Sequence, residues 1–117
     1  MRVLVVDDEK PCLDELVYML SGQENVEIAG AFTSPQEALR TSAALNPEVA
    51  FLDLIMPNLK GVELATKLLE LNPALKIVFV TAYGKELARI RNSPAVCCLL
   101  KPVSRLKLQE FLQRLPD

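Results

Sequence analysis

Five positions in the chain carry side chains whose types and spacing could do chemistry together. They are the pair Asp7 and Asp8, followed by Asp53, Thr81 and Lys101. Three carboxylates in one place repel one another unless a cation lies among them, and oxygen ligands without histidine or thiolate favour Mg²⁺. A lysine and a hydroxyl beside a metal-bound carboxylate suit a phosphoryl group, which Asp53 could attack as a carboxylate nucleophile. These residue types indicate phosphoryl transfer to a carboxylate, provided that the fold brings them together.

Each of these residues follows an apolar run of the kind that forms a buried parallel strand. The predicted strands cover residues 3–6, 26–32, 49–52, 77–80 and 96–100. Helices are expected to begin near residue 11, to cover 35–45, to span the apolar positions 64–71, to cover 85–92, and to span the apolar positions 108–115. This alternation predicts an α/β domain with a parallel sheet covered on both faces. Because ligands bind at the carboxyl edge of such a sheet, the five polar residues should converge there.

The composition excludes several other kinds of site. The 117 residues include no histidine, which removes Ser-His-Asp and Cys-His catalysis and histidine-based zinc sites. The three cysteines lack metal-binding spacing, and we interpret them as small buried residues of a reducing compartment. A net charge of −2 argues against binding nucleic acid by charge alone. With no signal-peptide pattern and no apolar run near the ~18 residues of a membrane span, we expect one cytoplasmic domain over residues 1–117, without membrane contact.

Five short motifs, in this order along the chain, resemble the receiver domain of two-component response regulators. The motifs are Val5-Val6-Asp7-Asp8-Glu9, Leu52-Asp53-Leu54-Ile55-Met56-Pro57, Gly61, Val80-Thr81-Ala82 and Leu100-Lys101-Pro102. The segments 77–83 and 99–103 look most like receivers that precede a LytTR-type DNA-binding domain. The resemblance implies a flavodoxin-like, doubly wound sheet of five parallel strands in the order 2-1-3-4-5, with five helices.

The resemblance also implies a role for each polar residue. Asp53 would be the phosphoacceptor, and Thr81 and Lys101 would contact the phosphoryl oxygens. The Mg²⁺ ligands would be Asp8 directly, Asp7 through water, Asp53, and the backbone carbonyl of Ile55. The Lys101–Pro102 peptide bond would be cis, which costs only ~0.5–1 kcal/mol before proline.

One position departs from the family pattern. Receivers usually carry tyrosine or phenylalanine three residues before the lysine, as a switch aromatic that turns inward when the threonine moves toward the phosphoryl group. This chain has Cys98 at that position. Tyr83 is a nearby aromatic that could take its place, so the switch candidates are Thr81, Tyr83 and Cys98.

The resemblance implies a signalling module, not an enzyme that acts on a separate substrate. A sensor histidine kinase would phosphorylate Asp53, and phosphorylation would drive homodimerisation or act on an effector domain outside these residues. The expected output is transcription regulation through a LytTR-type effector, with no nucleic-acid binding by the receiver itself.

Three alternatives stay open at this point. A pseudo-receiver would bind partners without phosphorylation; the complete acidic set and Lys101 argue against it, whereas Cys98 keeps it open. A small Mg²⁺-dependent aspartyl-phosphate phosphatase usually has a second aspartate where this chain has Ile55. A carrier of FMN on a related fold would hold phosphate in its first loop, which the acidic run from Asp7 to Glu9 would repel.

Overall fold

The computed structural model describes residues 1–53, 61–81 and 96–115. The predicted helix over 85–92 and the site candidates Ile55 and Tyr83 lie outside this described part. Within it, no helix combines the length and the apolarity that crossing a membrane requires.

Five strands form one parallel sheet. They are β1 (Arg2–Val6), β2 (Glu27–Phe32), β3 (Val49–Asp53), β4 (Lys76–Thr81) and β5 (Val96–Leu100). The order across the sheet is β2-β1-β3-β4-β5, and every pair of neighbours is parallel. The flavodoxin-like order 2-1-3-4-5 is therefore confirmed. Each strand also lies within one residue of its predicted bounds. In β1, β3 and β4 this is because strands buried on both faces are marked by continuous apolar runs, whereas the edge strand β2 contains no buried residue.

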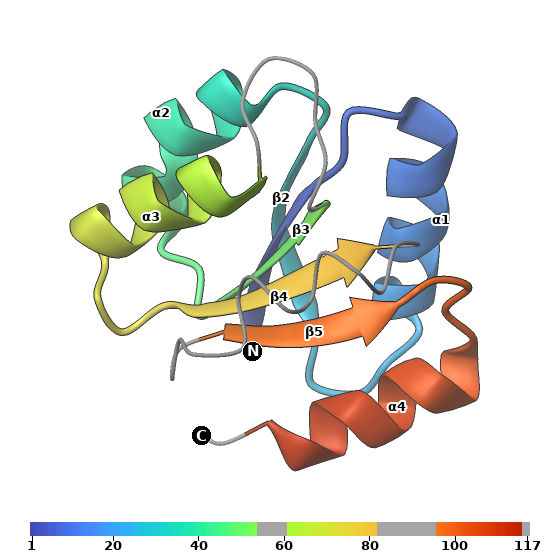
Figure 1. The fold of residues 1–117 in the computed structure, drawn as a ribbon. Coiled ribbons are helices and arrows are strands. Elements are labelled where there is room, and N and C mark those ends of the chain that lie inside the picture. Colours follow the sequence, from blue (N-terminus) through green and yellow to red (C-terminus); the bar gives the residue numbers. More distant parts are fainter. Residues whose placement is uncertain (54–60, 82–95, 116–117) are drawn as a thin grey trace.

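Among the described residues, two helices cover each face of the sheet (Figure 1). The helices are α1 (Lys10–Ser21), α2 (Pro35–Leu45), α3 (Gly61–Leu71) and α4 (Arg105–Arg114). Figure 1 shows α2 and α3 on one face and α1 and α4 on the other. The start of α2 is fixed by Ser34, whose hydroxyl oxygen accepts a hydrogen bond from the Glu37 amide at 3.2 Å.

The strand residues divide between two hydrophobic clusters, one on each face of the sheet, because successive side chains of a strand point to opposite faces. In β3, Leu52 belongs to the cluster under α2 and α3, whereas Phe51 belongs to the cluster under α1 and α4. The helix expected over the apolar positions 64–71 is α3, in which Leu64, Ala65 and Leu68 are buried. Leu71, the last residue of this helix, is 58% exposed.

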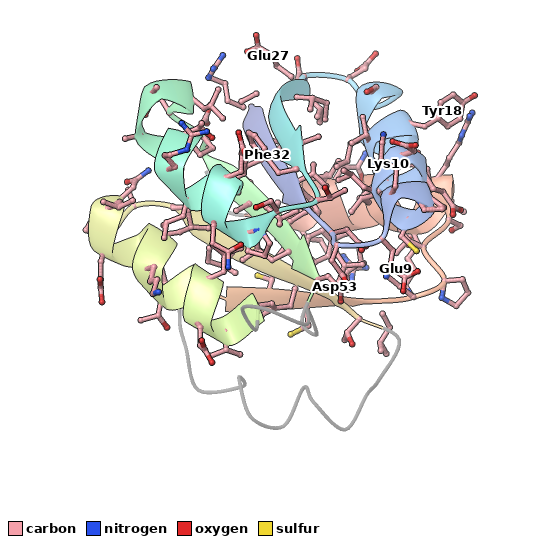
Figure 2. All side chains as sticks on the ribbon, turned by 90° about the horizontal axis from the view of Figure 1, so that it is seen from above. Glu9, Lys10, Tyr18, Glu27, Phe32 and Asp53 are labelled. Atoms are coloured by element: carbon pink, nitrogen blue, oxygen red, sulfur yellow. The ribbon has the colours of Figure 1, made fainter. Side chains whose placement is uncertain are left out.

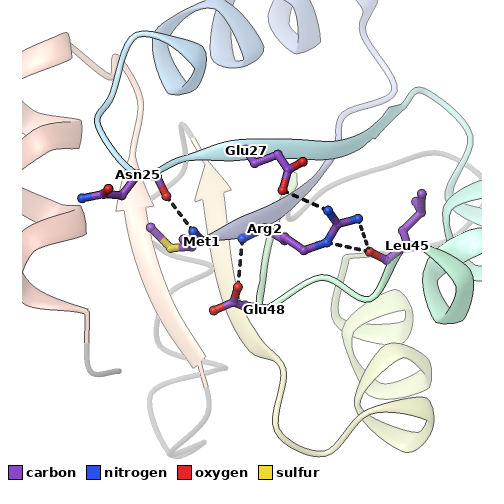
Figure 3. A network of polar contacts seen from close by, with 6 residues as sticks. All are labelled: Met1, Arg2, Asn25, Glu27, Leu45 and Glu48. Carbon is purple, nitrogen blue, oxygen red and sulfur yellow. Dashed lines mark hydrogen bonds and ion pairs between the residues drawn. The ribbon is translucent and has the colours of Figure 1, made fainter.

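A polar network ties the amino ends of the strands together (Figure 3). The Arg2 guanidinium donates to the Leu45 carbonyl, at 3.0 Å from Nε and 2.6 Å from Nη2, and pairs with Glu27 at 2.9 Å. The Arg2 amide donates to the Glu48 carboxylate at 3.2 Å. These contacts fix β1 against β2 and α2, and thereby fix where β1 delivers Asp7 at its other end.

Candidate functional site

Three aspartates meet at the carboxyl edge of the sheet. Asp7 and Asp8 directly follow β1, and Asp53 ends the neighbouring strand β3. One carboxylate oxygen from each residue lies within 4.8 Å of the other two. In Figure 2, Asp53 and Glu9 lie close to each other, and Glu27, at the start of β2, lies far from both. The predicted convergence of these three carboxylates is therefore what the fold produces.

Asp7 is the buried member of this group. The residue has only 3% of its surface exposed, and one carboxylate oxygen accepts a hydrogen bond from the Glu9 amide at 3.0 Å. The other oxygen lies 3.4 Å from the Lys101 ammonium. The Asp7 amide donates to the Phe32 carbonyl at 3.1 Å, which holds the residue against the end of β2. Both the backbone and the side chain of Asp7 are thus fixed.

Lys101 reaches the aspartates from the end of β5. Its amide donates to the Thr81 carbonyl at 2.8 Å, and the Lys101–Pro102 peptide bond is cis, as expected. Burial on its own lowers the pKa of Lys101, but the carboxylates of Asp7 and Asp53 more than offset this, so the pKa is raised. The raised pKa keeps the ammonium charged at neutral pH. The stabilisation that this adds is complete at neutral pH and is lost only as the pH rises through a value above the ordinary 10.5.

The strand order also brings Thr81 to this edge. Thr81 ends β4 and is 1% exposed, and the sheet register pairs it with Leu100, the residue before Lys101. The same register pairs Asp53 with Val80. Asp53, Thr81 and Lys101 thus stand at the ends of three adjacent strands, as the sequence predicts.

Comparison with known protein families agrees with this geometry. Residues 3–113 match the response regulator receiver domain. The chain belongs to this family. It is 38% identical over 117 residues to an uncharacterized response regulatory protein of Yersinia pestis, covering 98% of this chain and 48% of that protein. It is 35% identical over 115 residues to the transcriptional regulatory protein BtsR of Salmonella typhi, again covering 98% of this chain and 48% of that protein.

The receiver domain spans about half the length of these curated relatives, with 48% covered in each. Among solved structures, it is similar to the response regulatory domain of mrkE from Klebsiella pneumoniae, with 29% identity and a TM-score of 0.86 over 98% of this chain and 94% of that one. Receiver domains generally use Mg²⁺ at an acidic site and interact with histidine kinases and effector domains.

The donor set of this receiver domain fits Mg²⁺. Asp7, Asp8 and Asp53 offer only carboxylate oxygens, which are hard ligands, and the chain has no histidine that would favour a transition metal. A cation among three carboxylates this close also offsets their mutual repulsion. The remaining candidate ligand, the carbonyl of Ile55, lies outside the described residues.

A cavity of about 380 Å³ adjoins this site, between α1 and the connection from β5 to α4. Asp7 and Lys101 line one part of it, and Cys12 and Glu15 approach from α1. Sequence reasoning took Cys12 for a core residue, because the pattern gives no sign of which helical positions face a cavity. Burial raises the pKa of the Cys12 thiol, and Lys101 lowers it only in part, so this thiol stays protonated at neutral pH.

The switch candidate Cys98 lies on the other side of the sheet. It sits in β5 beside Phe79 of β4, is half-buried, and packs against the hydrophobic cluster under α2 and α3. Cys97, its neighbour in sequence, packs against the opposite cluster. The two thiols therefore point to opposite faces, and burial raises the pKa of Cys98.

Proposed function

We propose that this receiver domain accepts a phosphoryl group on Asp53 from the phosphohistidine of a sensor histidine kinase, in a Mg²⁺-dependent reaction, and that the modification changes how the domain binds its partners. The observation that carries the proposal is the grouping of three carboxylates within 4.8 Å, with the Lys101 ammonium 3.4 Å from one of them. The site then combines the Asp53 nucleophile, three carboxylates that could bind a divalent cation, and the positive charge of Lys101.

The transfer forms one bond and breaks one. An Asp53 carboxylate oxygen bonds to phosphorus, and the bond between phosphorus and the kinase imidazole nitrogen breaks, with the nitrogen keeping the electron pair and then taking up a proton. Lys101 stabilises negative charge on the phosphoryl oxygens, and the Thr81 hydroxyl donates a hydrogen bond to one of them. Asp8, Asp53 and, through water, Asp7 would hold Mg²⁺, which neutralises further phosphoryl charge when bound.

Phosphorylation adds about −1.5 to −2 charges at one edge of the sheet. Lys101 lies at that edge and already pairs with Asp7, so the added negative charge competes with Asp7 for the Lys101 ammonium. The Lys101 ammonium would then interact differently with Asp7 in the phosphorylated and unphosphorylated states, and a two-state switch needs such a difference in interaction. Because the relatives are about twice as long and include the transcriptional regulatory protein BtsR, we propose a DNA-binding effector domain, of the LytTR type, as the controlled partner.

The direct test is phosphorylation in vitro. Incubating the chain with Mg²⁺ and phosphoramidate, a small phosphodonor with the same phosphorus–nitrogen bond, should add one phosphoryl group by intact-mass spectrometry. The adduct should be stable in acid and labile in base, as an acyl phosphate is. Omitting Mg²⁺ or adding EDTA should suppress it. A chain that takes no label under these conditions, or takes it equally without Mg²⁺, contradicts the proposal.

We also expect Cys98 to weaken the coupling between phosphorylation and binding. A thiol has little volume to exchange between two packings, so it makes a poor two-state element. Phosphorylation should therefore change the dimerisation constant of the wild-type chain by only ~1 kcal/mol, or about fivefold. Cys98→Tyr restores the aromatic of the family pattern and should enlarge this effect.

Sedimentation equilibrium with and without phosphoramidate measures the dimerisation constants. Cys97→Tyr is the matched control, since it places the same ring on the opposite face of β5. A wild-type response that exceeds that of Cys98→Tyr would show that the signal does not need an aromatic at this position. Tyr83, the other switch candidate, lies outside the described residues and stays a prediction.

A further inference from the structure

The side chain of Lys107, on α4, reaches back to the strand that carries Lys101. The Lys107 ammonium donates a hydrogen bond to the Leu100 carbonyl at 2.8 Å. Leu100 is the last residue of β5, so the carbonyl that Lys107 contacts belongs to the peptide unit whose N–H is that of Lys101. Figure 1 shows α4 lying alongside β5 after the chain reverses between them.

The position of Lys107 is unfavourable for a lysine by helix electrostatics alone. It lies in the first turn of α4, where its amide donates to the hydroxyl of the N-cap residue Ser104 at 3.1 Å. The amino end of a helix carries a partial positive charge, which disfavours a cation there, and this turn contains no acidic residue to compensate. Helix stability therefore does not explain a lysine at this position, whereas its hydrogen bond to the Leu100 carbonyl does.

The contact acts on a peptide unit that is held from two sides. The Lys101 amide of this unit donates to the Thr81 carbonyl on β4, at 2.8 Å. The N–H and C=O of one trans peptide unit point in opposite directions, so the Leu100 carbonyl faces away from β4. Lys107 holds this outward side of β5, which is the last strand in the order of the sheet. The unit that precedes Lys101 is therefore fixed by Thr81 on one side and by Lys107 on the other.

We propose that Lys107 is a positioning residue for phosphorylation: it fixes the Leu100–Lys101 peptide unit and so holds the Lys101 ammonium at the aspartate cluster. This inference rests on the proposed function for its consequence, but its structural part concerns the described residues alone. The Lys101 ammonium lies 3.4 Å from Asp7, at the long end of hydrogen-bond range, so a shift of the Lys101 backbone that its side chain does not compensate breaks this contact with the aspartate cluster.

The first measurement needs neither metal nor phosphodonor. In Lys107→Met, which keeps the length and loses the ammonium, we expect the Lys101 amide to exchange its hydrogen about threefold to tenfold faster by NMR. Exchange of amides at the centre of β1, such as that of Leu4, should stay unchanged. Lys107→Arg keeps a charged donor and should restore most of the protection. Arg105→Gln is the matched control, because it removes a neighbouring charge of the same turn whose guanidinium lies over the Tyr18 ring, 4.9 Å from its centroid.

The second measurement is the rate of phosphorylation by phosphoramidate at saturating Mg²⁺. Lys107→Met should slow it by about threefold to tenfold, whereas Arg105→Gln should stay within about twofold of the wild type. Mg²⁺ affinity should not fall in either variant, because neither substitution removes a carboxylate of the aspartate cluster. In a chain that already carries Lys101→Ala, Lys107→Met should have no further effect on the rate, because the group that it positions is gone.

Three results would overturn the inference. One is unchanged exchange at the Lys101 amide in Lys107→Met. Another is an equal loss of rate in Arg105→Gln, which would make the effect one of charge. The third is a full effect of Lys107→Met in the Lys101→Ala chain. Failure of the proposed function looks different: the wild type then takes no label, and the exchange measurement alone decides whether Lys107 holds the Lys101 backbone.

Discussion

Asp53→Asn is expected to abolish the phosphoryl adduct completely. The substitution keeps the size of the side chain but replaces a carboxylate nucleophile by a neutral amide, which does not form an acyl phosphate. Intact-mass spectrometry after incubation with phosphoramidate and Mg²⁺ should show one added group on the wild type and none on the variant. The variant should fold at least as stably without metal, since it removes one of three carboxylates within 4.8 Å of one another.

Glu15→Gln provides the matched control for Asp53→Asn. Glu15 is also a carboxylate near the site, but it lines the adjoining cavity from α1 and is not part of the three-aspartate group. The Glu15→Gln variant should be phosphorylated at the wild-type rate. An adduct that survives in Asp53→Asn would move the nucleophile to another residue. Asp8 would then be the first to test, because Asp7 is buried and its two oxygens already contact the Glu9 amide and Lys101.

The positions of most strands could be predicted because a strand that is buried on both faces has a continuous apolar sequence. The runs before Asp7, Asp53, Thr81 and Lys101 are apolar without alternation, and each ends at a polar residue. Parallel strands place all such ends at one edge, so the convergence of the polar residues follows from the topology. The order of the strands depended on the family resemblance, since apolar runs say nothing about which strands are neighbours.

Residue types alone could not separate the roles of adjacent residues at the site, and the expectation that Asp8 binds Mg²⁺ directly and Asp7 through water came from the family resemblance. Asp7 and Asp8 have the same chemistry and neighbouring positions, but only Asp7 is buried and tied to both Glu9 and Lys101. That difference depends on the direction in which β1 ends relative to β2 and β5. The contact of Lys107 with Leu100 could not be predicted from the sequence either, because it depends on how α4 packs alongside β5.

Asp8→Ala and Lys101→Ala should affect Mg²⁺ binding in opposite ways while both impair phosphorylation. Asp8→Ala removes a proposed direct ligand and its charge, so Mg²⁺ affinity should fall by at least the ~10–100-fold that is lost when a metal's outer partners are changed. Phosphorylation at a fixed Mg²⁺ concentration should fall with it. Without metal, the variant should be at least as stable as the wild type, since one of three repelling carboxylates is removed.

Lys101→Ala removes a competing cation, so Mg²⁺ should bind as tightly as in the wild type or more tightly. Phosphorylation at saturating Mg²⁺ should nevertheless fall by about 10²-fold, because the charge on the phosphoryl oxygens loses a fixed donor. The metal-free variant should be less stable than the wild type. Asp7, with 3% of its surface exposed, then keeps a buried charge without its ammonium partner.

Isothermal titration with Mg²⁺, thermal unfolding with and without the metal, and labelling by phosphoramidate measure these effects separately. Lys10→Ala is the control for Lys101→Ala. It also removes a lysine, at the start of α1, but Lys10 pairs with the exposed Asp14 and not with the aspartate cluster. If Lys101→Ala weakened Mg²⁺ binding as much as Asp8→Ala does, Lys101 would be holding the aspartates in place and not acting on the phosphoryl group. If instead Mg²⁺ restored the lost stability of Lys101→Ala but not its phosphorylation, the metal would replace the ammonium in compensating the Asp7 charge but not in stabilising the phosphoryl oxygens.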